Sequence, residues 1–364
     1  MERKKRVFIL GAGFSKPAGM PLATELLPLL AQKLQLEPHD EMQKWLDGLR
    51  ERLVWLRGSG QQPHSSALNI EEVFHCAHFD IEAYLLKQHL CDAGQRVGPG
   101  VARDYAELIS GWLLHLEDAL RDVIVEEEEK ANFAPIIRWA ESVNDLDTVL
   151  TFNYDTLVEQ ALSKLGKTWN HGMGREVRTG NAICKLHGSI DWIVADRIEH
   201  FKKLDLLFDQ QNTNRASPKT GYIEDDYRLW RCRTRDQLQD WISGRDFQLV
   251  PEDASLRSVG IAGLGAYKQP HKIPGLGLVW HRGMRALYES DAGIFVGFSM
   301  SDFDTLARMQ FAEVARKRQS ESRPLRVVVI DPHADSQTKK RFEGVFRSVE
   351  LVISPHQKVD WSIY

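Results

Sequence analysis

The chain has 364 residues, a net charge of −4, 43% hydrophobic residues and 27% charged residues, which is typical of a globular protein with one large domain or two smaller ones. This charge argues against broad electrostatic binding to nucleic acid or to a membrane, and no apolar run is long enough to span a bilayer. The apolar run near the start is too short for a signal peptide, and the four cysteines have no paired spacing, so we expect a cytoplasmic protein.

The first expected element is a buried strand at residues 7–10, which stops at the run Gly11-Ala12-Gly13-Phe14-Ser15. A glycine turn between a strand and a helix lets backbone N–H groups approach phosphate oxygens, and Ser15 adds a hydroxyl group. The third glycine of the dinucleotide-binding fingerprint is missing, because Lys16 stands in its place. The turn indicates nucleotide binding, with an ordinary strand-to-helix turn as the alternative.

Helical periodicity extends from about residue 22 to residue 145. It predicts a first helix at residues 22–35 and then three further apolar faces, which we interpret as a helical insertion at residues 37–145. We expect the acidic run at residues 126–129 to be a solvated helix face. A nicotinamide-dependent dehydrogenase would instead continue with a second strand and an acidic residue about twenty residues beyond the glycines. The helical pattern therefore argues against an oxidoreductase.

Strand-like runs return at residues 147–152, 182–186, 292–296, 325–330 and 349–353, with an irregular insertion or lid expected at residues 195–275. Four runs end in polar or glycine-rich residues, at 11–15, 153–155, 297–302 and 331–333. The carboxyl ends of parallel strands meet at one edge of a sheet, where ligands bind. The sequence thus predicts an α/β fold, with a Rossmann-like, doubly wound, mostly parallel sheet formed by residues 1–36 and 146–364.

Four motifs in this order resemble the sirtuin superfamily: GAGFS (11–15), TFNYD (151–155), KLHGS (185–189) and GFSMSD (297–302). They are most similar to the bacterial sirtuin-like branch, whose members destroy NAD in anti-phage defence, and residues 69–74 resemble the insertion helix of that branch. The resemblance covers the α/β core and says little about residues 195–275. The zinc-binding cysteines of the protein deacylases are missing, as are the Asp, Phe and Arg that follow their glycine turn. The resemblance therefore implies NAD hydrolysis rather than deacylation.

The resemblance also implies residue roles. Asn153 would hold the nicotinamide ribose and the attacking water, and His187 would be the general base, a task that suits an imidazole. The residues implied in binding the rest of NAD are Gly11, Ala12, Gly13, Phe14, Ser15, Asp155, Gly297, Ser299 and Asp331. The alternatives are a helix-capping role for Asn153 and a hydrogen-bonded core position for His187.

No metal site is expected. His75, Cys76, His78 and Asp80 lie close together in the sequence, but on a helix Cys76 does not share a face with the two histidines.

These features lead us to expect an NAD glycohydrolase that takes NAD as its substrate, releases nicotinamide and ADP-ribose, and acts as a toxic effector of abortive anti-phage defence. Such an enzyme must be silent in a healthy cell. We expect control by homo-oligomerisation or by a partner, such as a ring-forming ATPase or helicase or an Argonaute-type sensor. Two alternatives stay open: an NAD-dependent protein deacylase or ADP-ribosyltransferase, and a non-catalytic module that senses NAD or ADP-ribose. The preference between NAD and NADP also stays open.

Overall fold

The computed structural model of the chain describes residues 5–56, 69–92, 99–171, 180–194, 221–224, 229–231, 259–261, 275–300 and 304–363. The chain divides into two compact units. The sheet unit comprises Met1–Met20, Ile124–Ala262 and Gln269–Tyr364, and the helical unit comprises Pro21–Val123 and Gly263–Lys268. The boundaries of the helical insertion expected from the sequence, at residues 37 and 145, stay a prediction.

The sheet unit is built on seven parallel strands in the order β11-β10-β9-β1-β2-β4-β3. Their bounds are Arg6–Leu10 (β1), Thr148–Thr151 (β2), Trp169–Asn170 (β3), Asn181–Lys185 (β4), Ala292–Val296 (β9), Arg326–Ile330 (β10) and Val349–Val352 (β11). The central strands β1 and β9 are buried along their whole length, which is why they read as unbroken apolar runs. The predicted fold class, a Rossmann-like doubly wound parallel sheet, is confirmed.

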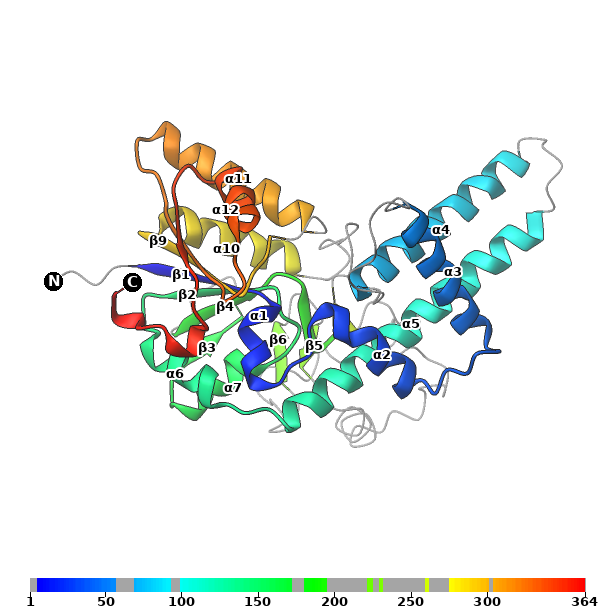
Figure 1. Cartoon of the computed structure of the whole chain (residues 1–364), viewed down its shortest axis with the longest axis horizontal. Helices are drawn as coiled ribbons and strands as arrows, with labels where there is room; N and C mark the ends of the chain where they lie inside the picture. Colours follow the sequence, from blue (N-terminus) through cyan, green and yellow to red (C-terminus); the bar gives the residue numbers. More distant parts are fainter. Residues whose placement is uncertain are drawn as a thin grey trace, which may run out of the picture. The chain divides into compact units, whose positions relative to one another are not determined.

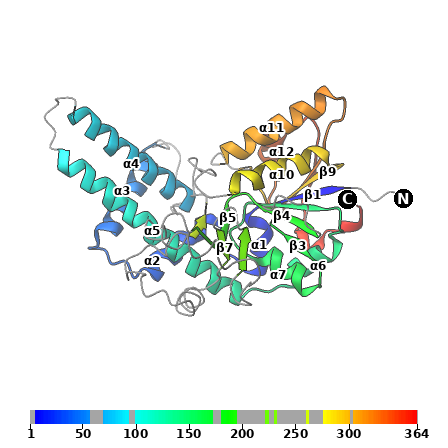
Figure 2. The ribbon, with the colours of Figure 1, turned by 180° about the vertical axis from the view of Figure 1, so that it is seen from behind.

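Helices cover both faces of this sheet (Figures 1 and 2). One face carries α10 (Leu276–Glu289), α11 (Thr305–Ser320) and α12 (Ser336–Glu343), and the other carries α6 (Ala134–Ser142) and α7 (Leu157–Lys164). The closing turns η6 (His356–Lys358) and η7 (Trp361–Ile363) pack on α6. Helix α10 lies close to the sheet at Gly283, where an added Cβ would be 3.2 Å from Leu150 and 3.5 Å from Cys184.

A buried ion pair fixes the start of β1. The Arg6 guanidinium donates from Nε and Nη2 to the two carboxylate oxygens of Asp147, at 3.1 and 2.6 Å, and also donates to the backbone oxygens of Ser142 and Trp361. A buried charge pair is tolerated when hydrogen bonds satisfy its remaining donors and acceptors. Arg6 therefore ties the strand to the residues before β2 and to the C-terminal turn.

The helical unit contains α2 (Ala23–Lys33), α3 (Glu41–Leu56), α4 (Ile70–Asp92) and most of α5 (Pro99–Glu129). Helices α4 and α5 lie side by side in both views (Figures 1 and 2). One apolar face expected from the sequence is buried, with Ile70, Val73, Phe74 and Ala77 on α4 fully enclosed, whereas Leu108 of the face expected on α5 is exposed. None of the helices in the described ranges has both the length and the apolar character that crossing a bilayer needs.

The first helix expected at residues 22–35 is confirmed as α2 (Ala23–Lys33), and a four-residue helix, α1 (Ala12–Ser15), and the turn η1 (Lys16–Ala18) lie between it and Gly11. One expectation about local structure is wrong. The region expected to be irregular contributes three short strands, β6 (Gly221–Glu224), β7 (Leu229–Arg231) and β8 (Val259–Ile261). With β5 (Gly188–Val194) they form a separate antiparallel sheet in the order β6-β7-β5-β8. The remainder of the expected lid at 195–275, apart from the start of the α10 region, lies outside the described residues.

The acidic run at the end of α5 is only partly solvated. Glu128 is 2% exposed, and its carboxylate accepts hydrogen bonds from the backbone N–H and the hydroxyl of Thr156. Gln160 donates to the same carboxylate at 3.2 Å. Glu128 therefore holds the start of α7, while Glu126 and Glu129 are exposed as expected.

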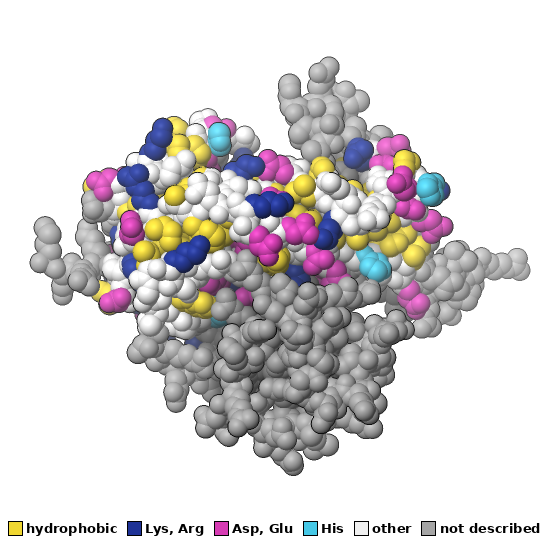
Figure 3. Space-filling view, turned by 90° about the horizontal axis from the view of Figure 1, so that it is seen from below, with side chains coloured by type: hydrophobic (Ala, Val, Ile, Leu, Met, Phe, Trp, Pro, Cys, Tyr) yellow, Lys and Arg dark blue, Asp and Glu magenta, His cyan; other side chains and the backbone are white. Residues whose placement is uncertain are grey.

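Charged side chains of both signs are interspersed over the described residues of the face seen in Figure 3. This mixture fits the small net charge of −4.

Candidate functional site

The glycine turn is packed against the end of the neighbouring strand β9. The N–H of Gly11 donates to the Val296 oxygen at 3.1 Å, and the N–H of Gly13 donates to the Gly297 oxygen at 3.0 Å. A Cβ added to Gly13 would lie 2.8 Å from the Gly297 Cα, closer than real side chains come. Gly297 itself has a φ of +57°, in the left-handed region that favours glycine. The motifs at 11–15 and 297–302 therefore form one tightly packed structure.

This packing also accounts for most donors of the turn. The Phe14 N–H donates to the Gly11 oxygen at 2.9 Å, so the N–H groups of Gly11, Gly13 and Phe14 all have acceptors within the protein. The Phe14 ring is buried against Trp139 and His356, with ring centroids 4.9 and 5.0 Å away. The buried Phe14 ring therefore fixes the turn to the protein interior. Ala12 is the exposed residue of α1.

Three side chains predicted for the site are joined by hydrogen bonds. The Asn153 Nδ2 group donates to the Gly11 oxygen and to Ser15 Oγ, both at 3.0 Å, and Ser15 Oγ donates to Asp155 Oδ2 at 2.7 Å. Because both amide hydrogens of Asn153 are used, its Oδ1 atom is the part of the side chain that can serve a ligand, as an acceptor. The structure thus connects Gly11, Ser15, Asn153 and Asp155 in one buried cluster.

The expected alternative for Asn153, a cap for the following helix, does not describe its contacts. The N-cap residue of α7 is Thr156, and the side chain that accepts from the first turn of α7 is Asp155, from the Leu157 N–H at 3.2 Å. The Asn153 side chain points instead to the glycine turn.

A buried ion pair lies beneath this cluster. The Lys185 ammonium is 3.2 Å from Glu159 Oε1 and donates to the backbone oxygen of Asp155, and both side chains are fully enclosed. Burial raises the pKa of the Asp155 carboxyl above its ordinary value, and the nearby Lys185 charge, the Ser15 hydroxyl and the Leu157 N–H partly oppose this shift. Lys185 and Glu159 are neighbours of the candidate site to which the sequence analysis gave no role.

His187 lies at the same edge of the sheet as Asn153. Strand β4 pairs with β2 in a register that places Thr151 beside Lys185, and the Leu186 N–H continues the ladder to the Thr151 oxygen at 2.9 Å. The ladder ends there, and the rings of Phe152 and Tyr154, the residues on either side of Asn153, lie 4.8 and 6.1 Å from the His187 ring between centroids. The imidazole packs edge-on against Phe152, with ring centroids 4.8 Å apart.

An acidic residue faces the imidazole. His187 Nε2 is 3.4 Å from Oδ1 of Asp304, and both side chains are almost completely buried. Asp304 is the N-cap residue of α11. Asp302, the last residue of the GFSMSD motif, lies outside the described residues.

The residues predicted for the adenosine half lie on the next strands along the same edge. Ser299 is exposed, and Arg341 donates to its backbone oxygen at 3.1 Å. The Asp331 carboxylate accepts from the His333 N–H at 2.7 Å, and β10 is three strand positions from β2 in the sheet order. That is about 14 Å at the usual strand spacing. Asp331 therefore shares the edge with Asn153 and His187 but does not belong to the hydrogen-bonded cluster around Asn153.

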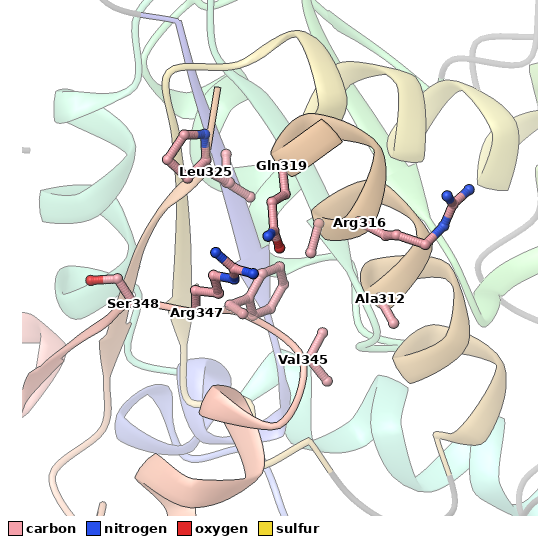
Figure 4. A pocket seen from close by; sticks show the side chains of 10 residues that line it. Ala312, Arg316, Gln319, Leu325, Val345, Arg347 and Ser348 are labelled. Atoms are coloured by element: carbon pink, nitrogen blue, oxygen red, sulfur yellow. The ribbon is translucent and has the colours of Figure 1, made fainter. Parts of the chain in front are cut away.

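The pocket shown in Figure 4 lies elsewhere. Its walls are the second half of α11, residues 324–325 at the start of β10 and residues 345–348 before β11, with Arg316 and Gln319 at its rim. These segments are at the amino-terminal ends of the strands, whereas the predicted site residues follow the carboxyl-terminal ends. The pocket is separate from the candidate site.

In the described ranges, no group of three or more His, Cys, Asp or Glu side chains is arranged to hold a metal ion. Asp80, one of the residues considered for a metal, accepts two hydrogen bonds from the Arg52 guanidinium at 2.7 and 2.9 Å.

No protein-family model matches the chain, and no curated protein matches it either. Among solved structures, the chain is similar to one described as giving the structural basis for the mechanism and regulation of Sir2 enzymes. The two share 13% sequence identity over 98% of this chain and 89% of the other, with a TM-score of 0.38. A similarity this weak carries no argument about activity.

Proposed function

We propose that the chain is a sirtuin-like NAD glycohydrolase, which cleaves the bond between nicotinamide and ribose and releases nicotinamide and ADP-ribose. The observation that carries this proposal is the Asn153 amide, whose two N–H donors are held by the glycine turn so that its oxygen is left as an acceptor, on a segment against which the His187 ring packs, at the carboxyl edge of a parallel sheet. Both donors of the amide are held by Gly11 and Ser15, so the orientation of Oδ1 is fixed before a ligand arrives.

The chemistry needs few groups. The C1′–N bond breaks with its electron pair going to the nicotinamide nitrogen, and the transition state has oxocarbenium character. The oxygen of a water molecule forms the new bond to C1′, and the proton of that water goes to His187. Asn153 Oδ1 orients the water or a ribose hydroxyl by accepting a hydrogen bond. Asp155 accepts a hydrogen bond from Ser15, and burial raises the pKa of its carboxyl. In this proposal Asp155 lies next to the nicotinamide pocket.

The glycine turn and the ends of β9 and β10 would hold the rest of NAD. In this proposal the diphosphate lies near Gly11, Ala12, Gly13 and Ser15, and Gly297, Ser299 and Asp331 follow along the same edge toward the adenosine half. Phe14 has a different part, because its buried ring supports the turn rather than facing a ligand.

The test is NAD consumption by the purified protein, with nicotinamide and ADP-ribose measured as products. His187→Ala should lower the rate by about 100-fold or more, the usual contribution of a general base. His39→Ala is the matched control, because His39 is exposed in the helical unit and should leave the rate unchanged. Asn153→Ala should also abolish turnover, and its unfolding free energy must be measured, because the amide also bonds Gly11 and Ser15.

The same assay separates the alternatives. Label transferred from NAD to protein would indicate an ADP-ribosyltransferase instead of a hydrolase. Acyl-ADP-ribose among the products would indicate a deacylase. Binding of NAD or ADP-ribose without turnover, unchanged by His187→Ala, would indicate a sensing module instead.

We further propose that NAD loss makes the protein a toxic effector of anti-phage defence, controlled by oligomerisation or a partner protein. Expression in a bacterial host with and without phage, beside the His187→Ala variant, tests this role. Toxicity that survives His187→Ala would contradict it.

A further inference from the structure

Asp304 faces His187 from a part of the chain that none of the sirtuin-like motifs assigned. We propose that Asp304 is the positioning residue for His187: its carboxylate holds the proton on Nε2, so that Nδ1 carries the lone pair that accepts a proton during catalysis. The catalytic part of this inference rests on the proposed function, whereas the pairing of the two side chains stands on the geometry alone.

The first observation is the position of Asp304 on its helix. An Asp at an N-cap ordinarily accepts a hydrogen bond from the second or third backbone N–H of the helix. Asp335 does this at the start of α12, where it accepts from the Thr338 N–H at 2.7 Å. The Asp304 side chain makes no such bond, although its backbone oxygen accepts from Arg308 as an N-cap should. The carboxylate faces the imidazole instead of capping α11.

The second observation is the enclosure of both groups. His187 is 4% exposed and Asp304 is 7% exposed. A carboxylate removed from water needs a donor or a positive charge beside it. The imidazole nitrogen Nε2, 3.4 Å from Asp304 Oδ1, is placed to meet this need.

The third observation is the restriction of the imidazole ring. Phe152 packs edge-on at 4.8 Å between ring centroids, and the Tyr154 ring lies at 6.1 Å with a tilt of 31°. These rings come from the segment that carries Asn153. The imidazole is thus held between the end of β2 and the start of α11, with little room to turn.

This arrangement fixes where the proton lies. An ionised carboxylate accepts hydrogen bonds and donates none, so the ring nitrogen that faces it carries the hydrogen. In a neutral imidazole the other nitrogen, Nδ1, is then unprotonated. When Nδ1 takes a proton, the positive charge that forms is stabilised by the neighbouring Asp304 carboxylate.

The first experiment reads the position of this proton directly. In protein labelled with ¹⁵N-histidine, the His187 signals are identified by their loss in His187→Gln, and we expect the Nε2–H tautomer in the wild type. Asp304→Asn presents an amide that can donate to Nε2, so the Nδ1–H tautomer should increase. Asp335→Asn changes the acid at another helix N-cap and should leave the His187 tautomer as it is. An unchanged tautomer in Asp304→Asn overturns the inference.

The second experiment measures turnover. Asp304→Asn should lower kcat for NAD cleavage about tenfold or more and leave KM within about threefold, because the imidazole acts on the reacting atoms rather than on binding. Asp335→Asn should match the wild type. An unchanged kcat in Asp304→Asn would overturn the positioning role. If Asp304→Asn does not fold, Asp304→Ser, which offers an ordinary N-cap, takes its place in both experiments.

The two readouts separate this inference from the proposed function. A tautomer that switches in a protein without NAD cleavage supports the pairing of Asp304 with His187 and removes the glycohydrolase proposal. NAD cleavage with a tautomer that does not respond to Asp304→Asn leaves the glycohydrolase and overturns the pairing.

Discussion

Replacing Gly297 with alanine should destabilise the sheet unit strongly, because the added methyl group meets backbone atoms. Its Cβ would lie 2.3 Å from both the Gly13 carbonyl carbon and the Phe14 nitrogen, more than 1 Å inside ordinary contact. The left-handed φ of +57° adds about 1 kcal/mol for a residue with a Cβ. Moving the turn away also weakens the bonds from Gly11 and Gly13 to the end of β9, each worth about 1 kcal/mol. With the overlap itself at about 1–3 kcal/mol, the total is about 4–6 kcal/mol.

Gly166→Ala is the matched control for this prediction. Gly166 has a φ of +68°, and nothing lies within 4 Å of its added Cβ, so the variant carries the backbone cost without the overlap. Urea denaturation should give a loss of about 1 kcal/mol in the free energy of unfolding for Gly166→Ala and several times more for Gly297→Ala. Equal losses in the two variants would refute the close packing of the glycine turn on β9.

Three further predictions concern buried ionisable groups. Lys185→Met should cost about 3–5 kcal/mol of unfolding free energy, because it leaves the Glu159 carboxylate buried without its partner. The double variant Lys185→Met/Glu159→Gln should recover part of this loss. Strictly additive losses from the two single variants would contradict the pairing. Burial lowers the pKa of His356 to about 4. Between about pH 6.5 and 4 the unfolded chain therefore binds more protons than the folded protein, and the free energy of unfolding should fall by up to about 3 kcal/mol as the pH drops through that window. His356→Phe keeps a ring against Phe14 and should flatten this pH dependence in urea denaturation; an equal dependence in both proteins would assign it to other groups. Burial raises the pKa of the Cys184 thiol to about 12, so iodoacetamide at pH 8 should modify Cys184 only after the protein unfolds. Mass spectrometry can follow this modification, and rapid labelling of Cys184 in the native protein would contradict the burial of the thiol.

The sheet could be predicted because parallel strands covered on both faces read as short apolar runs. The run at 292–296 coincides with β9, and the runs at 325–330 and 349–353 differ from β10 and β11 by one residue. Because strand direction is common to a parallel sheet, the polar ends of these runs lie at one edge of the sheet, as predicted.

The second sheet could not be predicted in the same way. Strands β6, β7 and β8 have three or four residues each, too few for a periodic pattern, and the pairing of β7 and β8 with β5 joins positions far apart in the sequence. The burial of Glu128 could not be predicted for a related reason. Glu128 stands in a run of four acidic residues, and only its contact with Thr156 distinguishes it from the exposed Glu129.

The candidate site was partly visible in the sequence. Asn153 and His187 follow apolar runs that form the paired strands β2 and β4, and the His187 ring packs against Phe152, the residue before Asn153. Asp304 carries a sequence signal too, an acid directly before a helix, but that signal describes a helix cap. Whether the Asp304 carboxylate caps α11 or faces His187 depends on how α11 packs in the folded protein. The local sequence around Asp304 does not determine this packing.

The glycines at 11, 13 and 297 show that one motif can satisfy two physical demands. A phosphate-binding turn needs glycine so that N–H groups can approach oxygens, and a turn packed on a neighbouring strand needs glycine so that backbones can approach each other. Here the second demand is met within the protein, since Gly11 and Gly13 already donate to β9 and neither has room for a Cβ. The glycines are therefore required by packing whether or not a nucleotide binds, and in the proposed reaction the turn acts by holding the Asn153 amide, which is anchored through Gly11 and Ser15 with its oxygen left as an acceptor.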